Sequence, residues 1–100
     1  MHDLISFRDL QKQDVNRYLS LAQEMEKNLY SKYELHKGKL AATLFFEPST
    51  RTNLSFQSAA QRLGMNPVPY NHETSSSKKG ESLTDTIKIV AGYADIAIIR

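Results

Sequence analysis

The sequence contains no cysteine, which excludes a disulfide framework, a thiolate metal ligand and a thiol nucleophile. It also contains no apolar run that reaches the roughly 18 residues typical of a membrane-spanning helix. The chain does not open with a basic segment followed by an apolar one, so we expect no secretory signal. These absences favour a soluble, cytoplasmic protein without a membrane partner.

Charge of one sign is also scarce. Thirteen Lys and Arg residues oppose eleven Asp and Glu residues, which leaves a formal net charge of +2. This excess is too small and too dispersed for a nucleic-acid-binding module, so any anion site must be local. The three histidines, at positions 2, 36 and 72, lack the spacing of metal ligands, and we expect no metal. With 40% hydrophobic residues, the 100 residues suit one small domain with a thin core.

Apolar residues in the first third of the chain recur at the helical spacing of three and four. This periodicity predicts an amphipathic helix over 14–30. Its apolar stripe, which we interpret as core rather than as a partner groove, consists of Val15, Tyr18, Leu19, Ala22, Met25 and Leu29. After a turn at Gly38, residues 39–46 form a nearly continuous apolar run. Such a run is typical of a parallel strand covered on both faces.

A second helix is predicted to follow that strand, with Ser49 as its N-cap and Gly64 at its end. The expected apolar stripe of this helix is Thr52, Phe56, Ala59, Ala60 and Leu63. Residues 66–70 are expected to be extended. Residues 71–82 contain no apolar side chain, which predicts a solvent-exposed loop.

The last part of the chain is predicted to be helix and then strand. Ser82 and Asp85 resemble a capping box at the start of a helix. One apolar face would hold Leu83, Thr86, Ile87, Val90 and Ala94, although the β-branched residues there leave a strand open as the alternative. Residues 95–100 are expected to be a strand. The order of elements predicts an α/β fold, a three-layer domain with a mainly parallel sheet and helices on both faces.

The tetrapeptide at positions 49–52, Ser-Thr-Arg-Thr, lies where the first strand meets the second helix. Unpaired N–H groups and the positive end of the helix dipole converge at such a turn and attract anions. Ser49, Thr50 and Thr52 would add hydroxyl donors, and Arg51 could bind two oxygens of a phosphate. The alternative is a capping serine with a solvated arginine, but ligands of open α/β sheets bind at this end of the strands.

Two further places could contribute charge. The loop with sequence SSSKKGES could close over an anionic substrate with Lys78 or Lys79, or it could be an ordinary solvated loop. Arg100 ends the last predicted strand, again at a carboxyl end, and could equally be a surface residue.

Taken in order, these pieces resemble the carbamoyl-phosphate domain of the aspartate carbamoyltransferase family, catalytic chain. The resemblance rests on FFEPSTRT, SF, RLG, SSSKKGES, DT and the closing DIAIIR, and it covers almost all of residues 1–100. It implies that Ser49, Thr50, Arg51 and Thr52 bind the phosphate of carbamoyl phosphate. It also implies that Arg51 and Thr52 contact the carbonyl oxygen, and that Arg100 is a further ligand of carbamoyl phosphate.

The same resemblance implies an active site shared between subunits. Lys79 would reach the phosphate and aspartate of a neighbouring subunit, accompanied by Ser75 or Ser76. A homotrimer is therefore expected, and regulatory chains are compatible with it. The family needs no metal or organic cofactor. Two departures, Asn53 in place of Arg and Gln57 in place of Glu, are expected to change helix-surface pairing rather than chemistry.

The implied reaction is transfer of the carbamoyl group from carbamoyl phosphate to the amine of L-aspartate, in pyrimidine biosynthesis. Ornithine carbamoyltransferase is the alternative enzyme, and SKKGES favours aspartate over it. A non-catalytic module that binds phosphate or serves assembly is the alternative from another class. Because the chain stops at Arg100, we expect the domain to be incomplete at its C-terminus, the aspartate-binding domain to be absent and the fragment alone to be inactive.

Overall fold

The structure is a computed structural model that describes residues 3–28, 35–71 and 82–100. The chain divides into two compact units, residues 1–31 and 32–100. No helix among the described residues is long and apolar enough to cross a membrane.

The first unit contains a short 3-10 helix, η1 (Phe7–Asp9), and the helix α1 (Lys12–Lys27). The predicted helix is confirmed, but it begins two residues earlier than expected because the N–H of Gln11 donates to Asp14 Oδ2 at 3.0 Å and caps its start. Residues 29 and 30, the predicted end, lie outside the described part of the chain.

The interpretation of the α1 stripe as core is wrong within the described residues. No residue of α1 is buried: Val15 and Met25 are half-buried, and Tyr18 and Leu19 are exposed. The physical reason is that the described residues of the first unit form only η1 and α1, which do not supply enough apolar surface to enclose a core. Periodicity identifies an apolar face, but it does not say what covers that face.

The second unit is built around β1 (Leu40–Phe45), the central strand of a three-stranded parallel sheet. β2 (Asn66–Asn71) pairs with one edge of β1 and β3 (Ile96–Ile99) with the other, so the strand order is β2-β1-β3. Five consecutive residues of β1, from Ala41 to Phe45, are buried. The expected strand with both faces covered is confirmed.

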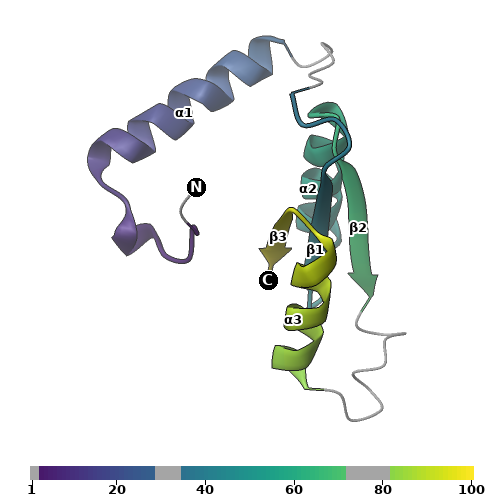
Figure 1. Ribbon diagram of the computed structural model, residues 1–100. Helices are drawn as coiled ribbons and strands as arrows, with labels where there is room; N and C mark the ends of the chain where they lie inside the picture. Colours follow the sequence, from purple (N-terminus) through teal and green to yellow (C-terminus); the bar gives the residue numbers. More distant parts are fainter. Residues whose placement is uncertain (1–2, 29–34, 72–81) are drawn as a thin grey trace. The chain divides into compact units, whose positions relative to one another are not determined.

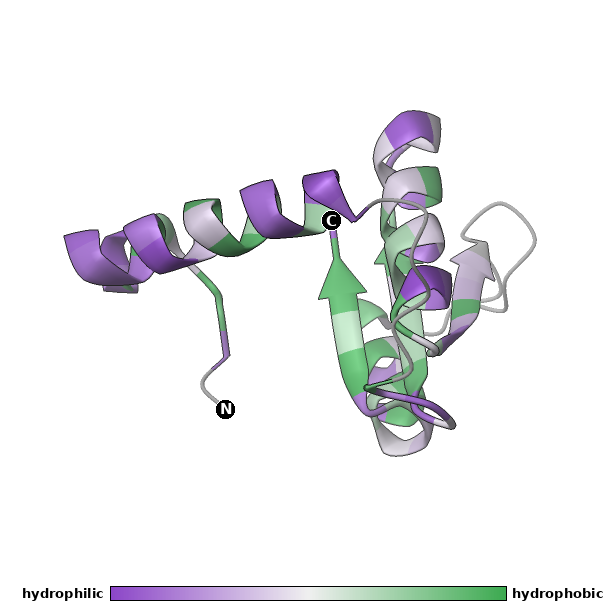
Figure 2. Cartoon of the chain, turned by 90° about the horizontal axis from the view of Figure 1, so that it is seen from above, coloured by the Kyte–Doolittle hydropathy of each residue, from purple (hydrophilic) through white to green (hydrophobic). Residues whose placement is uncertain are grey.

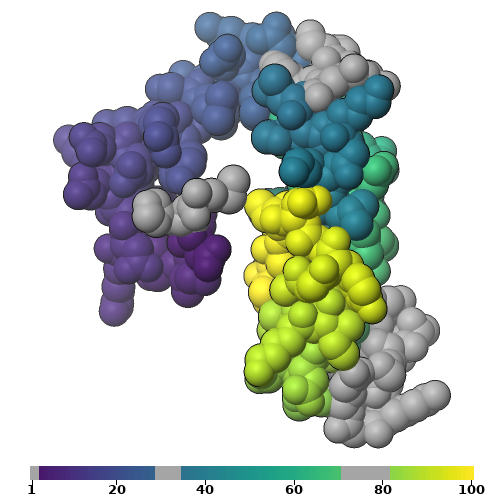
Figure 3. Space-filling model, in the orientation of Figure 1, coloured from purple at the N-terminus to yellow at the C-terminus, as the bar shows by residue number. Residues whose placement is uncertain are grey.

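The two remaining helices, α2 (Thr50–Arg62) and α3 (Leu83–Tyr93), cover opposite faces of the sheet. The chain moves from β1 through α2 to β2, and then back past β1 through α3 to β3. Crossovers between parallel strands are right-handed almost without exception, so reversing the direction along the sheet places the helices on opposite faces. Figure 1 shows α2 behind β1 and α3 in front of it, and α3 forms the viewer's face of this unit in Figure 3. The predicted three-layer α/β architecture is confirmed.

The last residue of α2 is Arg62, and the predicted terminator Gly64 follows two residues later with φ +84°. The N–H of Gly64 donates to Gln61 O at 3.0 Å and that of Met65 to Ala60 O at 2.8 Å, a glycine-terminated helix end. The expected stripe is only partly correct. Ala60 is buried and Thr52 and Leu63 are half-buried, whereas Ala59 is exposed and Phe56 is 41% exposed.

α3 resolves the choice between helix and strand in favour of the helix. Ser82 Oγ accepts a hydrogen bond from the N–H of Asp85 at 3.1 Å, and this cap starts the helix. On the predicted face, Thr86 is buried and most others are half-buried, while Leu83 at the helix start is exposed. Of the predicted loop over 71–82, Asn71 is the last residue of β2 and residues 72–81 lie outside the described chain.

β3 is short and poorly covered. Ile96 is 39% exposed and Ile99 is 50% exposed, although both are strongly hydrophobic, and Figure 2 colours this strand green. β2, with two prolines, is paler in the same view. The core therefore lies on β1 and on the helix residues that face it, and the extended segments predicted at 66–70 and 95–100 are both confirmed as strands.

Candidate anion-binding site

The candidate site lies where β1 gives way to α2, at the carboxyl end of the central strand. Ser49 occupies the N-cap position with φ −151° and ψ 60°, and its carbonyl accepts the first helical hydrogen bond from Asn53 N–H at 2.9 Å. The Ser49 side chain makes no capping hydrogen bond. The sequence predicted the position of the cap correctly, but the hydroxyl is not used to close the helix.

The first turn of α2 leaves its backbone donors open. Among the described residues, the N–H groups of Thr50, Arg51 and Thr52 find no acceptor. The first N–H groups of any helix point along its axis away from the helix, and here they point beyond the end of the sheet. They form a set of parallel donors for an anion.

The charge of α2 reinforces this feature. The helix sequence, TRTNLSFQSAAQR, contains no Asp or Glu, so no carboxylate compensates the positive end of its dipole. The other two α-helices in the described chain each carry an acid in the first turn, Asp14 in α1 and Asp85 in α3. α2 is therefore the helix whose N-terminus retains its attraction for an external anion.

Arg51 adds a cation to the same turn. Its side chain is exposed, and among the described residues its guanidinium has no hydrogen-bond or ion-pair partner. An unpaired guanidinium beside open N–H groups can bind two oxygens of a phosphate or a carboxylate without first breaking another contact.

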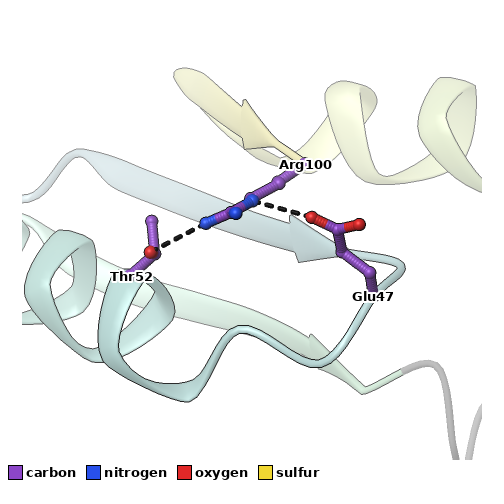
Figure 4. Close-up of polar contacts among 3 residues, drawn as sticks. All are labelled: Glu47, Thr52 and Arg100. Atoms are coloured by element: carbon purple, nitrogen blue, oxygen red, sulfur yellow. Dashed lines mark hydrogen bonds and ion pairs between the residues drawn. The ribbon is translucent and has the colours of Figure 1, made fainter.

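Arg100 reaches the site from β3 (Figure 4). Its Nε donates to Glu47 Oε1 at 2.7 Å, and its NH1 donates to Thr52 Oγ1 at 2.9 Å. Its backbone continues the β1–β3 ladder: Arg100 N–H donates to Leu44 O at 3.0 Å, and Phe46 N–H donates to Arg100 O at 2.9 Å. The guanidinium therefore bridges the turn after β1 and the first turn of α2.

Glu47 is the residue that sequence reasoning missed. It pairs with Arg100 across 53 positions of the chain, and both side chains are half exposed. One sequence feature could have identified it: Glu47 is the only acid between the start of β1 and the end of α2. A carboxylate standing alone beside a predicted anion site needs a cation as partner.

The structure brings together the predicted residues that it describes. Ser49, Thr50, Arg51 and Thr52 occupy one turn, and Arg100 contacts Thr52 directly. The predicted loop residues Lys79, Ser75 and Ser76, together with Lys78, lie outside the described residues. Within the described ranges there is no group of three His, Cys, Asp or Glu residues that could hold a metal ion.

The two residues that depart from the family pattern contact each other. Gln57 Nε2 donates to Asn53 Oδ1 at 2.9 Å, one helical turn apart, and the pair is partly buried. This contact agrees with the expectation that these two positions affect pairing on the helix surface.

Chemically, the site offers two arginines, several hydroxyls and a set of backbone donors at one end of a parallel sheet. These groups match the oxygens of a dianion such as a phosphate monoester, or those of an acyl phosphate. Because the backbone donors belong to one helical turn and Arg100 is bonded to Thr52, these groups are fixed relative to one another before a ligand binds.

Comparison with protein families gives a match over residues 2–100 to the family model described as aspartate/ornithine carbamoyltransferase, carbamoyl-P binding domain. Among curated proteins, the aspartate carbamoyltransferase catalytic subunit of Thermococcus onnurineus is 50% identical over 101 residues, which covers 98% of this chain and 33% of that protein. The catalytic subunit from Methanococcus vannielii is 48% identical over 103 residues and covers 100% of this chain and 34% of that protein.

Solved structures give the same result. The catalytic subunit of M. jannaschii aspartate transcarbamoylase aligns with a TM-score of 0.88 and 46% identity over 100% of this chain and 34% of that one. Trypanosoma cruzi aspartate transcarbamoylase in complex with carbamoyl phosphate and aspartate aligns with a TM-score of 0.89 and 34% identity, covering 97% of this chain and 31% of that one. The chain spans about a third of the length of these relatives.

Proposed function

The chain belongs to the aspartate/ornithine carbamoyltransferase family, and on this premise we propose that the protein transfers the carbamoyl group of carbamoyl phosphate to L-aspartate. The products are N-carbamoyl-L-aspartate and phosphate, a step of pyrimidine biosynthesis in the cytoplasm. The observation that carries the proposal is the open, acid-free N-terminus of α2, with Arg100 held against its first turn.

In this proposal, carbamoyl phosphate binds with its phosphate at the first turn of α2. The open N–H groups and the hydroxyls of Ser49 and Thr50 donate to the phosphate oxygens. Arg51 and Thr52 contact both the phosphate and the carbonyl oxygen, and Arg100 supplies the second cation. The absence of any acid from α2 supports this assignment, and so does the guanidinium of Arg51, which has no partner in the described part of the chain.

The reaction needs no protein nucleophile, metal or organic cofactor. The amine nitrogen of aspartate attacks the carbamoyl carbon and loses a proton, and the bond from that carbon to the phosphate oxygen breaks as phosphate departs. Negative charge grows on the carbonyl oxygen and then on the leaving phosphate. Fixed cations and donors at these two places lower the barrier because they need no reorganisation during the reaction.

The remaining part of the site is proposed to come from a second subunit of a homotrimer. Lys79, with Ser75 or Ser76, would reach the phosphate and aspartate of its neighbour. Regulatory chains are compatible with this assembly. The chain spans only a third of its relatives, so the remaining contacts to aspartate are proposed to come from residues outside these 100.

Two alternatives are distinguished by substrate. The family description covers ornithine as well as aspartate, but the curated relatives named above are aspartate carbamoyltransferase catalytic subunits, which supports aspartate. A non-catalytic module that binds phosphate or serves assembly would bind carbamoyl phosphate at most and turn over neither amine.

The test is carbamoyl transfer by the full-length protein, with aspartate and ornithine assayed in parallel. Wild type should react with aspartate, Lys79→Ala should lose this activity, and Lys78→Ala, the matched control one residue away, should retain it. Activity with ornithine alone would establish the alternative enzyme, and activity with neither amine would establish a binding or assembly module.

A mixing experiment tests the shared site. Full-length Arg51→Ala and Lys79→Ala subunits, each inactive alone, are dissociated and reassembled together. Because their defects lie on opposite sides of one interface, some mixed sites should contain neither substitution, and activity should return. A mixture that stays inactive although hybrid trimers form would show that each subunit carries its own complete site.

A further inference from the structure

Asp95 closes the beginning of the β1–β3 pair, at the end of the sheet opposite the candidate site. Its N–H donates to Leu40 O at 2.9 Å, and its Oδ2 accepts from Leu40 N–H at 2.8 Å. Leu40 is thus bonded through both of its backbone polar groups to one residue. This double contact lies immediately before the first register pair of the two strands, Ala41 with Ile96.

Apart from Asp95, the position of β3 depends on its backbone hydrogen bonds with β1 and on the contacts of Arg100. The strand is four residues long, its partner on one edge is β1, and the register rests on the pairing from Ala41–Ile96 to Leu44–Ile99. Ile96 and Ile99 are substantially exposed, so burial contributes less to its register than it does in β1. In a strand, a slip of one residue turns every side chain to the other face.

Such a slip would remove Arg100 from the site. Arg100 lies directly after β3, and its guanidinium reaches Glu47 and Thr52 only in the observed register. We propose that Asp95 is a positioning residue that sets the register of β3 on β1 through Leu40 and thereby places Arg100 at the anion site. This inference rests on the proposed function, because it treats Arg100 as a ligand of carbamoyl phosphate.

The acceptor oxygen of Asp95, rather than its charge, does the positioning. The ion pair to Lys39 is long, with Nζ 3.8 Å from Oδ1, and both side chains are about half exposed. An exposed pair of this kind contributes little. The contact with Leu40 N–H is short, at 2.8 Å, and an amide oxygen can accept the same hydrogen bond.

The experiment measures carbamoyl phosphate binding to the full-length protein by titration calorimetry. Asp95→Ala should weaken binding about tenfold, because it removes the hydrogen bond from Leu40 N–H and releases the strand. Asp95→Asn, which keeps an acceptor oxygen, should bind within about twofold of wild type, and so should Lys39→Ala, which removes only the ion pair. Equal weakening by Asp95→Asn and Asp95→Ala would overturn the proposal.

Two controls separate positioning from general loss of stability. Ser82→Ala removes a helix cap far along the chain from Arg100, and at comparable loss of stability it should not weaken binding. In an Arg100→Ala background, Asp95→Ala should cause no further loss of affinity, because the residue it positions is gone. A full additional tenfold loss in that background would contradict the inference.

A measurement without ligand keeps the inference independent of the proposed function. Amide hydrogen exchange followed by NMR should show Phe46 N–H, which donates to Arg100 O, exchanging faster in Asp95→Ala than in Asp95→Asn. If Asp95→Ala does not fold, Asp95→Glu, which displaces the oxygen by one methylene, should give a smaller change in the same direction. Wild type that binds no carbamoyl phosphate would refute the proposed function. Unchanged Phe46 exchange would refute the role of Asp95.

Discussion

Both α2 and α3 have a serine at the N-cap position, but the two serines differ in whether they make a capping hydrogen bond. Ser82 accepts a hydrogen bond from Asp85 N–H, and Asp85 itself adds a carboxylate to the first turn of α3. Ser49 makes no capping bond, and α2 has no acid at all. A helix end whose first N–H groups are capped within the chain stabilises the fold. A helix end whose first N–H groups are unpaired keeps these donors and its dipole for a ligand.

The same contrast explains why Arg100 lies at α2. The open end of α2 offers Thr52 Oγ1 as an acceptor, and the neighbouring turn offers the carboxylate of Glu47. These two contacts hold a cation beside N–H groups that themselves attract anions. A structural helix end has no use for a cation there, since the dipole repels it.

The largest expected effect follows removal of the cation from the open end. Arg51→Ala in the full-length protein should lower kcat for carbamoyl transfer about a hundredfold to a thousandfold and raise KM only a few-fold, because the guanidinium stabilises charge that develops during the reaction. Steady-state kinetics measure this. Lys88→Ala, which removes an exposed cation from α3, is the matched control and should be neutral. Unchanged kcat in Arg51→Ala would contradict the assignment.

The next largest effect is expected when an acidic residue is introduced into the first turn of α2, where α3 already has one. Thr50→Asp should weaken carbamoyl phosphate binding more than about tenfold through charge repulsion. It should also raise the free energy of unfolding by about 0.5 kcal/mol through the helix dipole. Thr50→Asn, without the charge, is the control for the lost hydroxyl. Equal affinity of the Asp and Asn variants for carbamoyl phosphate would contradict the claim that the acid-free start of α2 binds the ligand.

Replacing each of the two N-cap serines by alanine should affect a different property: stability in one case and ligand affinity in the other. Ser82→Ala should lower the free energy of unfolding by about 1 kcal/mol, because a capping bond is lost, without changing carbamoyl phosphate affinity. Ser49→Ala should leave stability within about 0.5 kcal/mol and weaken binding several-fold, because its hydroxyl caps nothing. Denaturant unfolding and calorimetry on the same preparations measure both. Equal losses of stability would erase the distinction between the two ends.

The smallest effect concerns two buried threonines, one with a hydrogen-bonded hydroxyl and one without. Thr43 in β1 is fully buried and its Oγ1 has no partner among the described residues, whereas Thr86 Oγ1 in α3 donates to Ser82 O at 3.1 Å. Thr43→Val should therefore be neutral or stabilising by a few tenths of a kcal/mol, and Thr86→Val should cost about 0.5–1 kcal/mol. A larger cost for Thr43→Val would indicate a partner for its hydroxyl.

Most of the fold could be predicted because its elements depend on local pattern. The apolar run of β1, the glycine that ends α2 and the serine that starts α3 each act within a few residues, and the alternation of strands and helices then leaves few topologies. The position of the anion site follows as well, since it lies at the carboxyl end of the central strand.

The features that could not be predicted depend on contacts between distant residues. The partner of Arg100 is 53 residues away, and only the register of β3 on β1 brings Glu47 to it. Whether Ser49 caps its helix depends on one backbone conformation, with ψ 60°, that its sequence does not determine. The exposure of Phe56 likewise depends on what lies opposite α2, which helical periodicity does not encode.

The central claim, that the open end of α2 is a carbamoyl phosphate site, is tested most directly by a crystal structure of the full-length protein with carbamoyl phosphate bound. The account predicts phosphate oxygens about 2.7–3.1 Å from the N–H groups of the first turn of α2, with Arg51 and Arg100 contacting the same ligand. A ligand bound at the capped end of α3, or anywhere away from α2, would contradict it.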